Sequence, residues 1–271
     1  MVGNVSTAEW QAEFERGRVV TWELKPATAT QIVRAGQRYR HLFPQITEPE
    51  VNSDVEILHE DEALIVVNKP APLPMHAGGR FHLNTLQHIL NAAYHPQTPY
   101  PAHRLDANTT GLVLAARTRS LAADLQSQFA QGRVEKTYLV RVPGAPREDH
   151  FHCTAAISAD AGEGCSRSVD LENGLSARTE FRVRGRFADG TTLLEARPLT
   201  GRTNQIRVHL WHLGFPVCGD PLYLPSRKLG RTQTLAAGAP PLCLHAAQAR
   251  FLHPLSRESV EFNAPLPAWA K

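Results

Sequence analysis

The pattern of apolar and polar residues is faint over the first fifty or so positions and clear afterwards. Residues 1–53 are polar and dotted with arginine, and they end in a connector rich in proline, asparagine and aspartate. Beyond this connector, short apolar runs alternate with turn signals. The pattern therefore predicts an N-terminal extension, residues 1–53, and a main domain, residues 54–271.

Two periodicities are interspersed through the main domain. Strand-like apolar runs occur at 55–58, 63–67, 111–116, 134–142, 177–187, 191–198, 242–251 and 259–265. Helical periodicity follows Asn84 and Ser120, which we expect to be N-caps, and also follows the polar segment at 200–205. Because some strands are joined by hairpins and others by helices, the predicted fold class is α+β, with a large mixed, mostly antiparallel β-sheet flanked by helices.

Composition narrows the class of protein without identifying a function. The chain is 42% hydrophobic with a formal net charge of +3, which suits a folded enzyme but does not by itself indicate a nucleic-acid binder. Arginine far outnumbers lysine; arginine grips phosphate in two places, but a codon bias would give the same ratio. No signal peptide, membrane-length apolar run or CxxC pair is present, so we expect a cytoplasmic protein with no membrane partner.

Two polar segments are candidates for chemistry, and each also has an ordinary structural interpretation. The segment 103–112 (HRLDANTTGL) places Asp106 in a loop before a buried strand, where it could equally cap backbone donors in a turn. The segment 200–210 (TGRTNQIRVHL) places Arg202 and Arg207 at the start of a helix. They could bind a carboxylate or a phosphate, or form a solvated first turn, although the helix dipole does not favour arginine there.

Five ordered motifs resemble the RluA family of RNA pseudouridine synthases. They are VVNKPAPLPMH (66–76), HRLDANTTG (103–111), KTY (136–138), GRTNQIRVHLWHLGFPVCGDPLY (201–223) and LHA (244–246). Their order and spacing match the family from about residue 54 to the C-terminus. The resemblance implies the pseudouridine synthase catalytic fold and an isomerase that acts on RNA.

The resemblance also implies roles for individual residues. Asp106 becomes the catalytic carboxylate, Arg207 its basic partner, and Tyr138 the side chain that stacks on the target base and could act as a general base. Arg104 would enter the RNA where the uridine leaves its stack, and Leu244 lies near an aliphatic pocket position. Further RNA-binding residues would be Lys69, His103, Arg202, Asn204 and Gln205, and further pocket residues Leu105, Thr110 and Gly111.

Two departures from the family pattern bear on fine positioning, and two other features bear on the RNA target. Asn204 replaces a more usual histidine and Thr110 a common serine, and both can still form hydrogen bonds. Many relatives carry an S4-type RNA-binding domain before the catalytic domain, so residues 1–53 could be a degenerate version. Residues 73–86 resemble the branch whose relatives modify the tRNA anticodon stem-loop. The expected partner is therefore tRNA or rRNA.

The implied reaction breaks the N1–C1′ bond of uridine, turns the uracil and rejoins it through C5. The base must first leave its stack. Asp106 would act as nucleophile or would trigger deprotonation at C2′, and the sequence leaves both routes open. The positive charge of Arg207 favours the ionised carboxylate. Because the base is retained and reused, we expect no metal or other cofactor. The resemblance also implies a monomer with no obligatory protein partner.

Other functions remain open. His209 and His212 lie three residues apart on the predicted helix, and with His245 they could belong to a metal-dependent hydrolase, although no HExxH motif is present. A catalytically silent RNA-binding or chaperone module could use the same fold, but it would have no use for an intact catalytic trio. A glycosylase that releases uracil is a lesser alternative.

Overall fold

The chain is divided into two units, Met1–Thr47 and Glu48–Lys271, in the computed structural model, which describes residues 6–43, 47–162 and 166–271. The division falls before the expected one at residue 53. Glu48 belongs to the larger unit because its carboxylate accepts hydrogen bonds from the backbone N–H groups of Leu83 and Asn84, both at 2.8 Å. Residues 48–53 of the expected extension are therefore part of the larger unit.

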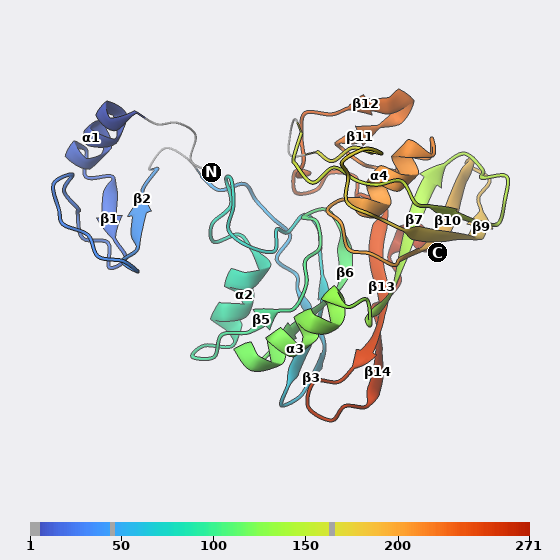
Figure 1. Ribbon diagram of the computed structural model, residues 1–271, viewed down its shortest axis with the longest axis horizontal. Helices are drawn as coiled ribbons and strands as arrows, with labels where there is room; N and C mark the ends of the chain where they lie inside the picture. Colours follow the sequence, from blue (N-terminus) through green and yellow to red (C-terminus); the bar gives the residue numbers. More distant parts are fainter. Residues whose placement is uncertain (1–5, 44–46, 163–165) are drawn as a thin grey trace. The chain divides into compact units, whose positions relative to one another are not determined.

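The smaller unit combines a helix with a two-stranded antiparallel sheet in its described residues (Figure 1). Its elements are α1 (Thr7–Glu15), β1 (Val19–Thr21) and β2 (Tyr39–His41). Ser6 and Glu9 form a capping box that satisfies free N–H groups at the start of α1. Glu13 then ties the helix to the sheet through His41, at 2.9 Å. An S4-like, RNA-binding nature for this unit stays a prediction.

A mixed sheet of ten strands, counted over the described residues, forms the frame of the larger unit (Figure 1). Its strands are β3 (Glu56–Glu60), β4 (Leu64–Lys69), β5 (Tyr100–Pro101), β6 (Thr110–Ala116), β7 (Glu135–Pro143), β8 (His150–Cys153), β9 (Thr179–Arg186), β10 (Thr191–Pro198), β13 (Leu244–Leu252) and β14 (Ser259–Asn263). The order is β3–β4–β6–β13–β7–β10–β9–β8, with β5 beside β6 and β14 beside β13. The β6–β13 pair is parallel and the other described pairs are antiparallel, so the predicted fold class is confirmed.

Three α-helices accompany this sheet in the described part of the larger unit. The helices and remaining short elements are α2 (Leu86–Ala93), α3 (Arg119–Ala130), α4 (Gln205–His212), β11 (Tyr223–Leu224), η2 (Pro225–Arg227), β12 (Lys228–Leu229) and η3 (Ala268–Ala270). The N-caps of α2 and α3 are Thr85 and Thr118, so the prediction of Asn84 and Ser120 is wrong by one or two positions. The Asn84 side chain instead donates to the Pro49 carbonyl group.

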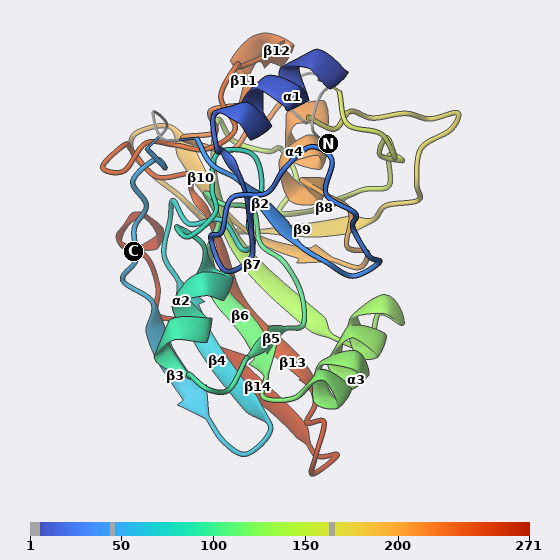
Figure 2. The ribbon, with the colours of Figure 1, turned by 90° about the vertical axis from the view of Figure 1, so that its left-hand side faces the viewer.

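The apolar core has two main parts that meet beside one tyrosine. Leu86 of α2 and Leu125 of α3 pack with the apolar residues of β4 and β6, and Figure 2 shows both helices in front of this half of the sheet. Leu210 of α4 packs with Val140 of β7 and its neighbours in β9 and β10. Tyr138 contacts both clusters. Among the described residues, no helix is both long and apolar enough to cross a membrane.

Candidate active site

A pocket of about 960 Å³ opens beside Tyr138, and segments that are far apart in the sequence form its walls. Its lining includes Asp106 and its neighbours in the loop before β6, the start of β7, and the turn that leads into α4. Leu105 and Leu244 line it as predicted. The first two candidate segments of the sequence are therefore brought together around one cavity.

The Asp106 carboxylate faces this pocket and is also hydrogen-bonded to Arg207. The Asp106 side chain is 30% exposed, and Oδ2 accepts a hydrogen bond from Nη1 of Arg207 at 2.9 Å. The backbone N–H of Thr109 donates to the Asp106 carbonyl oxygen at 3.1 Å and closes the turn. The carboxylate is therefore both reachable from the pocket and paired with a cation.

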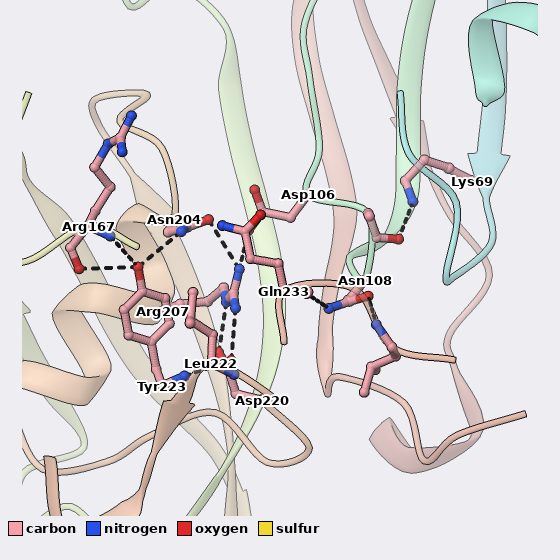
Figure 3. A network of polar contacts seen from close by, with 12 residues as sticks. Lys69, Asp106, Asn108, Arg167, Asn204, Arg207, Asp220, Leu222, Tyr223 and Gln233 are labelled. Carbon is pink, nitrogen blue, oxygen red and sulfur yellow. Dashed lines mark hydrogen bonds and ion pairs between the residues drawn. The ribbon is translucent and has the colours of Figure 1, made fainter. Parts of the chain in front are cut away.

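The guanidinium group of Arg207 joins Asp106 to a second, deeper carboxylate (Figure 3). Nε and Nη2 donate to the two oxygens of Asp220 at 2.7 and 2.8 Å, and Nη1 also donates to Asn204 at 3.1 Å. Burial acts to lower the pKa of Arg207, but the hydrogen bonds and charges of Asp220 and Asp106 raise it overall. Arg207 is therefore a permanent cation with a fixed orientation.

Asp220 and Tyr223 are site residues that the sequence reasoning missed. The Asp220 side chain is fully buried, and it also accepts the backbone N–H groups of Leu222 and Tyr223 at 2.9 and 3.0 Å. The Tyr223 hydroxyl accepts a hydrogen bond from the Asn204 side chain at 3.0 Å. The motif that contains both residues, GDPLY, was visible at 219–223 and was the signal that could have identified them.

Tyr138 projects from β7 into the pocket. Burial, and then the negative charge of Asp106, raise the pKa of Tyr138 above its ordinary value. The hydroxyl group therefore stays protonated at neutral pH. A neutral phenol is a poor general base but a good stacking surface, so the structure favours the first of the two expected roles.

The prediction that Lys69 binds RNA is wrong. Its ammonium group is fully buried and donates to the carbonyl oxygens of Pro70, Leu73 and Ala107 at 2.9, 2.9 and 3.1 Å. Burial lowers the pKa of Lys69 to about 7, although the charge of Asp106 acts to raise it. Lys69 therefore braces the loop that carries Asp106 instead of meeting a phosphate group.

Asn204 and Gln205 line the pocket but are largely buried, so their contact with RNA stays a prediction. Asn204 is committed to Tyr223 and Arg207, as described above. The Gln205 side chain donates to Thr179 at 2.9 Å and accepts from the backbone N–H of Arg202 at 3.0 Å. Both side chains fix the turn into α4 from within.

Thr110 and Gly111 lie behind the described residues that line the pocket, so the prediction that they belong to its wall is wrong. The Thr110 hydroxyl is hydrogen-bonded to Nδ1 of His245 at 2.8 Å. Gly111 has φ +108°, and a Cβ atom there would overlap the carbonyl oxygen of Ala246. Gly111 therefore permits the close approach of β6 and β13.

The three remaining RNA-binding candidates lie at the pocket. Arg104 and Arg202 are exposed, and Arg202 donates to the Ser176 carbonyl oxygen at 2.9 Å. Nε2 of His103 accepts the backbone N–H of Leu114, and burial lowers the pKa of His103 to about 4, so this ring is neutral. Contact of these three residues with RNA stays a prediction.

His209, one of the histidines that suggested a hydrolase, has other partners. Both ring nitrogens of His209 are hydrogen-bonded at 2.9 Å, one to Thr179 and the other to the Ala155 carbonyl oxygen. Within residues 6–43, 47–162 and 166–271, no group of three histidine, cysteine, aspartate or glutamate side chains is placed to hold a metal ion. The described residues thus give the hydrolase alternative no support.

The family model for RNA pseudouridylate synthases matches residues 63–212 of this chain. The chain belongs to that family. Ribosomal large subunit pseudouridine synthase D of Nitrosomonas europaea is 34% identical over 96% of the chain and 79% of its own length. Dual-specificity RNA pseudouridine synthase RluA of Pasteurella multocida is 33% identical, over 80% of the chain and 95% of its own length. The expected RluA family and isomerase class are confirmed.

Other relatives differ in length or share the fold. RNA pseudouridine synthase 7 of Arabidopsis thaliana is 36% identical over 77% of the chain, which spans about half (54%) of that protein. The solved structure of human RNA Pseudouridylate Synthase Domain Containing 1 superposes with a TM-score of 0.63 at 28% identity, over 82% of this chain and 87% of that one. The synthase fold is therefore shared with a solved structure.

Proposed function

We propose that this protein converts one uridine in a structured tRNA or rRNA to pseudouridine, with Asp106 as the nucleophile. The observation that carries the proposal is the Asp106–Arg207 ion pair at the pocket beside Tyr138. The names of the Nitrosomonas and Pasteurella relatives, which refer to the large ribosomal subunit and to dual specificity, support an RNA substrate of either class.

In this mechanism the Asp106 carboxylate attacks C1′ of the flipped nucleotide as the N1–C1′ bond breaks. The uracil leaves with the bonding electrons, turns within the pocket, and attacks C1′ through C5, which releases Asp106. The C5 proton is then lost to solvent and N1 gains one, so the product is an isomer of the substrate. Arg207 orients the carboxylate for the first step through its hydrogen bond to Oδ2.

The tyrosine ring and an exposed arginine would hold the nucleotide outside its stack. Stacking of a base on an aromatic side chain contributes about 1–3 kcal/mol, and Tyr138 offers such a surface next to Asp106. Arg104, exposed at the pocket rim, would occupy the place that the uridine leaves in the RNA. Cofactor independence, a monomeric state and a cytoplasmic location stay predictions.

The test is to incubate the protein with unmodified transcripts of tRNA and rRNA and to map pseudouridine by chemical adduct and reverse-transcriptase stop. We expect one new stop that is absent with Asp106→Asn. Asp189→Asn is the matched control, because Asp189 is a paired but exposed aspartate on the surface, and it should keep the stop. Tight RNA binding without any pseudouridine would instead support the silent binding module.

A further inference from the structure

A buried asparagine ties the catalytic loop to a distant segment of the chain. Asn108 lies two residues after Asp106 and is 1% exposed. Its Nδ2 group donates to the carbonyl oxygen of Gln233 at 2.6 Å, and its Oδ1 atom accepts the backbone N–H of Leu235 at 2.9 Å (Figure 3). One side chain therefore fixes the backbone of residues 233–235 through one donated and one accepted hydrogen bond.

Residues 233–235 reach the same pocket as Asp106. Gln233 and Thr234 line it, and Leu235 packs against the core cluster beneath α4. The Gln233 side chain is exposed and has no hydrogen-bond partner within the part of the chain that the structure describes. A carboxamide offers a donor and an acceptor side by side, which is what the edge of an unstacked RNA base presents in return.

We propose that Gln233 determines specificity by binding the base of a nucleotide next to the target uridine, and that Asn108 positions it. This inference rests on the proposed function, because it requires an RNA whose uridine enters the pocket. The segment is anchored by Leu235 and Asn108, so the backbone that carries Gln233 is already in place at the rim and only the side chain must be ordered on binding.

The catalytic loop does not depend on Asn108 for its own shape. The carbonyl oxygen of Ala107 accepts hydrogen bonds from Lys69 at 3.1 Å and from the backbone N–H of Leu73 at 2.8 Å. Arg207 holds the Asp106 side chain separately. Removal of the Asn108 carboxamide should therefore release residues 233–235 more than it moves Asp106, and it should raise KM more than it lowers kcat.

The experiment is a double-mutant cycle on an RNA that the wild type modifies, with kcat and KM measured separately. Gln233→Ala and Asn108→Ala should each raise KM about 10-fold, which corresponds to about 1.4 kcal/mol, with a much smaller change in kcat. The KM of the double variant should be no higher than that of Asn108→Ala, because a displaced Gln233 no longer contacts the RNA and its removal costs nothing further. Gln97→Ala, an exposed glutamine near the far end of β6, is the matched control.

A second arm tests specificity directly by replacing each nucleotide that flanks the target uridine. The wild type should discriminate at one position, and Gln233→Ala should lose that discrimination even if Asn108→Ala proves too unstable to assay. Wild-type KM and wild-type discrimination in Gln233→Ala, or additive effects in the cycle, would overturn the inference. Absence of pseudouridine with the wild type would be a separate result, since it contradicts the proposed function itself.

Discussion

The buried carboxylate Asp220 offers a sharp test of how the site is held, through the substitution Asp220→Asn. Three of its four hydrogen bonds fall on Oδ1, from Nη2 of Arg207 and from the backbone N–H groups of Leu222 and Tyr223. The fourth joins Oδ2 to Nε of Arg207. An asparagine oxygen can keep the first three, but its NH₂ group would then face the Nε–H group, so one hydrogen bond is replaced by a donor–donor contact.

The expected loss of stability follows from the charge as well as from this contact. Two unit charges about 4 Å apart attract by about 4 kcal/mol at an effective dielectric constant of about 20. Removing one partner of a buried ion pair costs about 3–5 kcal/mol, because the other charge remains buried. Asp106 still neutralises Arg207 in part. We therefore expect a loss near the lower end of that range, with a fall in Tm of roughly 6–12 °C.

The assay combines thermal unfolding with kcat on the RNA that the wild type modifies. With Asp220→Asn, Tm should fall, and kcat should fall at least about 10-fold, because a re-oriented Arg207 no longer holds Asp106. Glu261→Gln is the control, since Oε2 of Glu261 accepts two hydrogen bonds from Arg250 on the exposed surface and its loss should leave both quantities near wild type. Wild-type Tm and kcat in Asp220→Asn would refute the view that Asp220 positions the site.

Two further substitutions test the elements around the catalytic loop. Gly111→Ala should lower the free energy of unfolding by at least about 2 kcal/mol, because its Cβ would overlap the Ala246 carbonyl oxygen. Gly185→Ala is the control, since a Cβ atom there has open space around it. Equal denaturation midpoints for the two variants would contradict the prediction. Burial lowers the pKa of Lys69 from 10.5 to about 7. Between these two pH values the unfolded chain binds more protons than the folded chain, so the free energy of unfolding of the wild type rises with pH. The difference in unfolding free energy between wild type and Lys69→Met should therefore shift in favour of the wild type from pH 7 upward, and a constant difference would contradict the burial of this charge.

Local pattern predicted the elements of the fold well, and it could not predict their order in space. The runs at 55–58 and 63–67 form the β3–β4 hairpin, because a strand pair closed by a short turn is encoded in neighbouring residues. The position of β13 between β6 and β7 depends on contacts across more than a hundred residues. No periodicity within a short window carries that information.

The sequence predicted the ion pair at the centre of the candidate site, but it did not predict the roles of the buried polar residues around that pair. The pairing of Asp106 with Arg207, implied by the resemblance, is present in the structure. Lys69 and Gln205 were expected to bind RNA on the resemblance, whereas both side chains are buried in the structure. Their burial follows from tertiary contacts: backbone carbonyl groups surround Lys69, and β9 covers Gln205. Sequence shows the residue type but not the atoms that surround it.

The central place of β13 sets the order in which this molecule can be completed during synthesis. The ribosome releases β6 and β7 well before residues 244–252, so the neighbouring edges of these two strands wait unpaired for the last long strand of the sheet. Leu244, which lines the pocket, arrives with that strand. A nascent chain that stops short of residue 244 therefore exposes two unpaired strand edges, which favour aggregation, and it lacks one wall residue of the pocket.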